Sequence, residues 1–200
     1  MLALLERLHR HKDAAYGDAW RKRGEVIAIF ANMARKYDRL VVAFSEQRAA
    51  ATEPLADTVA DLCVYAGKYL TWLADEHPDE LDDAGLPLPP AATISDANGP
   101  DALRRVFAAI VAAPTSSPED SPEAWRRVQD TFATLERGLM AQAKPGSPHG
   151  DSLSVASKAG LAWALVQNSA SLLALLDAED PARLEKLRDE IAQMDDAARP

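Results

Sequence analysis

The 200-residue chain has a single cysteine, Cys63, so it has no internal disulfide and no cluster of thiolates that would hold a metal ion. We expect Cys63 to pack in the core. Its four histidines are scattered, and His9 and His11 lie two positions apart, on different sides of a helix. This spacing argues against a zinc site.

The sequence also lacks an excess of basic residues. Lys and Arg number 22 against 31 Asp and Glu, which gives a formal net charge of −9. A basic surface that displaces counterions from a nucleic-acid backbone is therefore not expected. Any phosphate that the protein binds must be met locally, by a few placed cations or by a metal ion.

No long uninterrupted apolar run occurs. The first ten residues include Glu6, Arg7 and Arg10, which interrupt any signal-peptide pattern. The most apolar stretch, "AGLAWALVQNSASLLALL", carries Gln167 and Asn168 at its centre. We expect this stretch to be a buried helix, and the protein to be cytoplasmic, with no membrane partner and no nucleic-acid partner.

Strand signals are also missing, because no stretch alternates apolar and polar residues with β-branched enrichment. The apolar fraction is 48% with only 6% aromatic residues, and Ala and Leu make up the balance. The 13 prolines lie at the edges of helical patterns, as in Ser121-Pro122-Glu123 and Asp180-Pro181, which are typical helix starts. These features predict an all-α helical bundle with helices near 2–15, 20–49, 53–76, 100–113, 122–143, 152–177 and 181–195.

Three parts are expected along the chain. Residues 1–78 form a helical core, residues 79–100 a linker rich in Pro and Asp, and residues 101–200 a C-terminal helical region. That region either packs on the core or forms a degenerate second half. Ala-Trp-Arg opens a helical stretch in both halves, but three shared residues in Ala-rich helices also agree with coincidence.

The third predicted helix, 53–76, carries Asp57 and Asp61 opposite its main apolar stripe, among apolar and aromatic residues such as Trp72. A helix that is apolar all round is covered on both sides, and covered carboxylates must be paired or bind a metal. Asp57 and Asp61 are one turn apart, with Glu53 one turn earlier. Such hard oxygen ligands suit Mg²⁺, with Mn²⁺ as a substitute.

The alternative is that the two aspartates form ion pairs across a helix interface, with Lys68, Lys36 or Arg39. On the second predicted helix, Glu25, Asn32, Lys36 and Arg39 share one strip. That strip is either a solvated helix face or the edge of a groove.

Three blocks, "KDAAYGDAW", "IFANMARKYDRL" and "DTVADLCVYAGKYL", resemble the nucleotide-modification-associated branch of the MazG-like all-α nucleoside triphosphate pyrophosphohydrolases. In that branch a Tyr-Gly-x-x-Trp element precedes a helix with Lys-x-x-Arg, matched here by Lys36 and Arg39. A later helix carries an acidic pair before a tyrosine, matched by Asp57, Asp61 and Tyr65. The resemblance covers roughly residues 10 to 75.

The resemblance implies a MazG-like core that hydrolyses the α,β-phosphoanhydride of a (deoxy)nucleoside triphosphate, giving a monophosphate and pyrophosphate. It implies Mg²⁺ held by Asp57 and Asp61 with Glu25 or Glu53, of which Asp57, Asp61 and Glu25 are the catalytic candidates. It also implies a homodimer, to which the two-sided third helix points as well. The residues that would contact the nucleotide are Lys12, Tyr16, Trp20, Asn32, Lys36, Arg39, Tyr65 and Lys68.

One departure from the family pattern concerns the metal ligands. Better-known members of the superfamily carry Glu-x-x-Glu on one helix, whereas Glu25 has no second glutamate because residue 28 is Ala. The alternative is a non-catalytic nucleotide-binding or protein-interaction module with an incomplete metal site, or a plain bundle with salt bridges. Three or four carboxylates around an open pocket favour the enzyme, and two that are engaged by Lys or Arg favour the alternatives. Tyr16 and Trp20 either stack on a base or staple two helices together.

Overall fold

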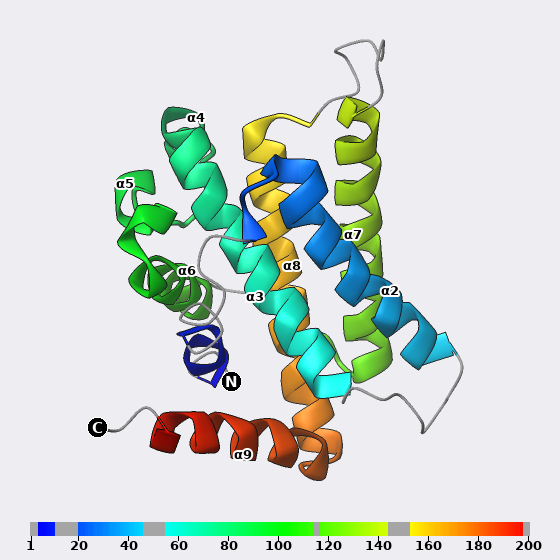
Figure 1. Cartoon of the computed structure of the whole chain (residues 1–200). Helices are drawn as coiled ribbons and strands as arrows, with labels where there is room; N and C mark the ends of the chain where they lie inside the picture. Colours follow the sequence, from blue (N-terminus) through cyan, green and yellow to red (C-terminus); the bar gives the residue numbers. More distant parts are fainter. Residues whose placement is uncertain (1–3, 11–19, 46–54, 114–116, 144–152, 198–200) are drawn as a thin grey trace.

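The computed structural model describes residues 4–10, 20–45, 55–113, 117–143 and 153–197 (Figure 1). Within these ranges every regular element is helical and no strand occurs, so the predicted all-α bundle is confirmed. After a first helix over residues 4–10, the elements are a π-helix η2 (Glu25–Phe30), α2 (Ala31–Ser45), α3 (Leu55–Glu76), α4 (Pro78–Asp82), α5 (Ala91–Ile94), a 3₁₀-helix η3 (Asp96–Asn98), α6 (Pro100–Ala112), α7 (Ser121–Ala143), α8 (Val155–Glu179) and α9 (Ala182–Ala197).

Helix α3 is the centre of the bundle. It contacts α2 on one side and α8 on another, and α4, α5, α6 and α9 also pack against it (Figure 1). Close approach of α6 depends on Gly67, because a Cβ there would lie 2.5 Å from Leu103 Cδ1. The two-sided burial predicted for this helix is therefore provided within one chain, and it does not require a second subunit.

Aromatic side chains join α2 to α7. The ring of Tyr37 stacks on Phe132 with centroids 4.0 Å apart, and Phe44 stacks on Trp125 at 4.6 Å. Stacked pairs of this kind add to the free energy gained by burying the rings. They hold one side of α2 against α7 and thereby fix which side of α2 turns toward α3.

Helix α8 lies between α3 and α7. Among the described helices it alone is long and apolar enough to cross a membrane by length and composition, and half of that stretch is buried inside the protein. Asn168, at its centre, donates a hydrogen bond to Thr131 Oγ1 of α7 at 3.1 Å. Asn168 therefore serves a contact between α8 and α7.

Two predicted segments differ from the structure. The prediction of one continuous helix from residue 20 is wrong at its start, because Gly24 has a φ of 78° and η2 begins only after it. Glycine populates this left-handed region without steric cost. The segment 79–100 contains α4, α5 and η3, which were not predicted, and buries Leu81 and Ile94 against the core.

Candidate functional site

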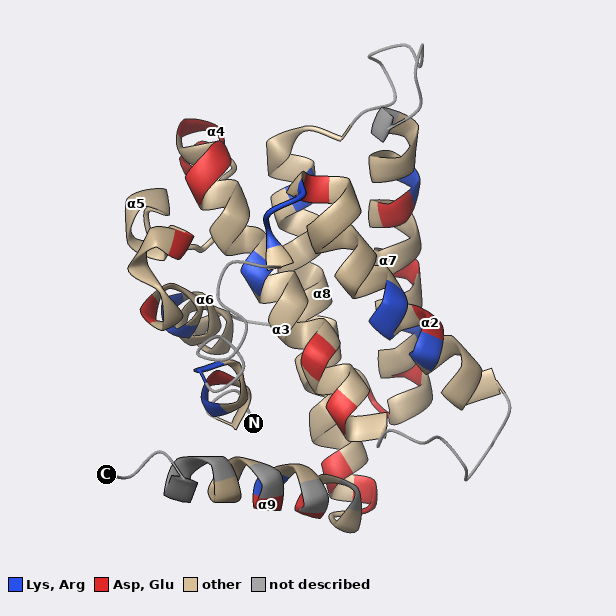
Figure 2. Ribbon diagram, viewed as in Figure 1, with Lys and Arg blue, Asp and Glu red and all other residues tan. Residues whose placement is uncertain are grey.

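One side of α3 meets the chain between residues 20 and 36. We call this side the α3 stripe, and its polar members lie seven residues apart, so they share one face of the helix. Figure 2 shows acidic positions in the first half of α3 and a basic position further along. The contacts of the stripe are Asp61 with Lys36, Lys68 with Trp20, and Asp75 with Arg21.

Lys36 and Asp61 form a buried ion pair. Lys36 Nζ lies 2.6 Å from Asp61 Oδ2, and the two side chains are only 9% and 8% exposed. Removing either member of such a pair leaves an uncompensated buried charge. Lys36 and Asp61, which lie on different helices, therefore form one of the ion pairs that the sequence offered as the alternative to a metal site.

Glu25 is held by two residues from other helices. Lys158 Nζ, from α8, lies 2.9 Å from both Glu25 carboxylate oxygens, and the Tyr69 hydroxyl donates a short hydrogen bond to Oε1. Burial and the neighbouring Glu25 charge raise the pKa of Tyr69, so this hydroxyl keeps its proton and acts as a donor. The Lys158 and Glu25 side chains are 5% and 12% exposed.

Lys158 is not among the site residues that the sequence predicts. It is a lone cation in the apolar segment "SVASKAGLAWAL", and a lone charge in an apolar helix needs a partner. That signal pointed to a buried pair, but not to Glu25, which lies 133 residues away.

Trp20 and Lys68 are both buried, and the Lys68 ammonium lies 4.8 Å from the centroid of the indole ring. An ammonium over an indole face is attracted by the ring's negative face. The predicted contact of these two residues with a nucleotide therefore concerns side chains that touch each other in the structure.

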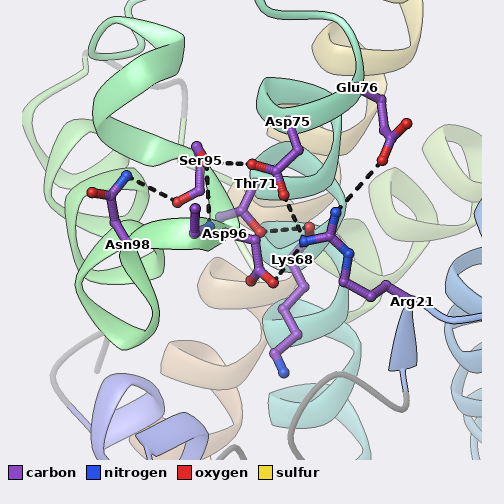
Figure 3. Close-up of polar contacts among 9 residues, drawn as sticks. Arg21, Lys68, Thr71, Asp75, Glu76, Ser95, Asp96 and Asn98 are labelled. Atoms are coloured by element: carbon purple, nitrogen blue, oxygen red, sulfur yellow. Dashed lines mark hydrogen bonds and ion pairs between the residues drawn. The ribbon is translucent and has the colours of Figure 1, made fainter.

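Arg21 joins the start of this segment to α3 and η3 (Figure 3). Its guanidinium lies 2.6 Å from Asp75 Oδ2 and 2.9 Å from Asp96 Oδ2, and Ser95 Oγ donates to Asp75 Oδ1. Burial raises the pKa of Asp96, against the opposing effect of Arg21. This network was not predicted, because Ser95 and Asp96 lie in the segment 79–100 that the sequence marks as a linker.

Four further predicted site residues lie within the described ranges. Asn32 donates to the Ala28 carbonyl of its own helical stretch at 2.9 Å, and Arg39 is exposed beside a groove between α2 and α7. Asp57 and Tyr65 are half-buried on α3. Three further predicted residues, Lys12, Tyr16 and Glu53, fall outside the described residues.

Within the described ranges the structure does not assemble the carboxylate set that the resemblance implies for Mg²⁺, and the candidate ligand Glu53 lies outside these ranges. No group of three or more His, Cys, Asp or Glu there is placed to hold a metal ion. The oxygens of Glu25 and Asp61 already face the ammonium groups of Lys158 and Lys36.

Cys63 is fully buried, and its thiol points to the Val166 carbonyl at 3.6 Å. Burial raises the pKa of this thiol. A protonated thiol in the core agrees with the expected packing role.

The site lies where three distant parts of the chain meet: the segment from Trp20 to Lys36, the middle of α3, and the start of α8. Its chemistry is that of buried lysines beside carboxylates and an indole. Comparison with protein-family models, with curated proteins and with solved structures gives no match to this chain.

Proposed function

We propose that this chain is a MazG-like helical protein that binds a nucleotide through its lysines, without a complete metal site. The observation that supports this most strongly is the clustering of three buried lysines, Lys36, Lys68 and Lys158, between 4% and 7% exposed, around α3. Buried ammonium groups are costly unless they are paired. Lys36 and Lys158 already face carboxylates and Lys68 faces an indole, so a bound phosphate would exchange with or add to these contacts.

Lys68 is the residue with which a phosphate would exchange most readily. Its ammonium lies over the Trp20 indole, and a phosphate would offer it a charge-assisted hydrogen bond in exchange for, or in addition to, this cation–π contact. An indole released by Lys68 would offer a face for the base, which is the role that the resemblance gives to Trp20. Lys36 and Lys158, which are paired with Asp61 and Glu25, would then add positive charge around the phosphate.

The state of the carboxylates favours binding over hydrolysis. Both Asp61 and Glu25 are engaged by lysines at 2.6 and 2.9 Å. Two engaged carboxylates are the arrangement expected of the non-catalytic alternative.

Isothermal titration of the full chain tests this function, with nucleoside mono-, di- and triphosphates of each base as ligands. We expect one class of nucleotide to bind, and Lys68→Gln to weaken it by about tenfold or more, because a hydrogen bond to a charged group is lost. The matched control is Arg126→Gln, which removes an exposed cation on α7. The absence of binding by any nucleotide, or equal binding by Lys68→Gln, would contradict the proposal.

The second candidate is the Mg²⁺-dependent pyrophosphohydrolase that the resemblance implies. It is favoured by Asp57 and Asp61, which lie one turn apart on α3. It requires Asp61 to exchange Lys36 for another partner. Release of pyrophosphate from a triphosphate in Mg²⁺, abolished by Asp61→Asn, would support this candidate over binding alone.

A further inference from the structure

The side of α2 that faces away from the core carries four residues in one line. Ala31, Arg35, Asp38 and Val42 are spaced by four, three and four positions, which places them on one stripe of an α-helix. All four are exposed, and Val42 has 52% of its surface accessible. We call this line the α2 stripe.

Apolar surface continues beside the α2 stripe. A groove of about 530 Å³ runs between α2 and α7, lined in part by Val26, Phe30 and Met140. Ile27 and Met140 are 69% and 37% exposed, so most of the exposed large hydrophobic residues in the described ranges lie on η2, α2 and α7. A groove with apolar lining beside an exposed helix face is a candidate interaction site.

The α2 stripe is complementary to itself. When a second α2 runs antiparallel, with a two-fold axis between residues 36 and 37, Arg35 faces Asp38 of the second copy and Ala31 faces Val42 of the second copy. The symmetry repeats each contact, as an isologous interface requires. Small Ala31 allows close approach, and the charged pair lies at the middle of the line.

The charges of the stripe are available for this pairing. Arg35 donates to Asn32 Oδ1 of its own helix at 2.8 Å. The Asp38 carboxylate is exposed on the same face. Each copy thus offers one cation and one anion in the register that the other copy needs.

We propose that α2 is the interface of a homodimer, with the two α2 stripes packed antiparallel. We take the partner to be a second copy because both the charged pairing and the Ala31–Val42 pairing of the α2 stripe are complementary to themselves about one two-fold axis, as an isologous interface requires. The alternative surface, α3, is covered by its own chain. This inference does not depend on nucleotide binding.

Charge reversal with sedimentation equilibrium tests the interface. We expect wild type to form a dimer, and Arg35→Asp and Asp38→Arg each to raise its dissociation constant about tenfold or more, because like charges then face each other twice. An equal mixture of the two variants should dimerise again, since the two acidic positions of one chain then face the two basic positions of the other. A dimer of either variant with itself places like charges opposite each other.

Asp101 and Arg104 of α6 supply the control. They form an exposed pair with the same three-residue spacing, 3.1 Å apart, so Asp101→Arg and Arg104→Asp should leave the dimer unchanged. Circular dichroism verifies that each variant is folded. A wild-type monomer at concentrations up to roughly 1 mM would overturn the proposal. So would a dimer insensitive to both reversals, or a mixture of the two that stays monomeric.

Discussion

The α3 stripe and the α2 stripe use the same kinds of residue in opposite surroundings. Asp61 and Lys36 are buried between helices, with Lys36 Nζ 2.6 Å from Asp61 Oδ2. Asp38 and Arg35 are exposed, and Arg35 bonds to Asn32 of its own helix. Helical spacing alone does not distinguish these two cases. The difference comes from what covers each face, and it predicts that the first set governs folding while the second governs association.

The largest effect is expected from Glu25→Ala. It leaves the buried Lys158 ammonium without its carboxylate and the Tyr69 hydroxyl without its acceptor. We expect the free energy of unfolding, measured by urea denaturation, to fall by about 4 kcal/mol. Adding Lys158→Met should restore much of this loss, and a double variant as unstable as the single one would argue against a buried pair.

A smaller loss, about 3 kcal/mol, is expected from Lys36→Met, which leaves Asp61 buried without its ammonium. Asp61→Asn in the same chain should recover stability at neutral pH. Stability equal to wild type at pH 7 for Lys36→Met would show that this pair contributes nothing.

Changes in the Arg21 network are expected to have a smaller effect on the free energy of unfolding than changes in the buried pairs, because its side chains are partly exposed. Burial raises the pKa of Asp96 in the folded state above its ordinary value of 3.8. At a pH between the two values the folded state therefore binds more protons than the unfolded state. The stability that this proton contributes is lost as the pH rises through the folded-state pKa. The unfolding free energy of wild type minus that of Asp96→Asn should therefore increase as the pH falls from 7 toward 4. We expect a change below about 1 kcal/mol, since solvent screens the group. A difference that decreases instead would contradict this assignment.

The smallest effect is expected on the α2 stripe. Arg35→Asp and Val42→Ser should change the free energy of unfolding by less than about 0.5 kcal/mol when measured at concentrations where the chain is monomeric. Both side chains are exposed, so neither leaves a buried charge or a cavity. A loss comparable to that of Lys36→Met would mean that this face is part of the core.

The sequence predicted the helical class and the long helices well, because their apolar periodicity is local. It also placed Asp61 and Lys36 among the possible ion pairs. It did not predict the contact of Glu25 with Lys158, nor that of Arg21 with Asp96, because these pairs depend on the way distant helices pack. The short helices α4 and α5 were missed, since a few residues between prolines carry too little periodicity to be recognised.

We propose that the lysines around α3, and not a metal ion, bind the nucleotide. Titration of wild type with nucleoside triphosphates in the presence of EDTA, repeated in Mg²⁺, tests it most directly. We expect binding in EDTA, weakened by Lys68→Gln. Binding that occurs only with Mg²⁺, or no binding under either condition, would contradict the claim.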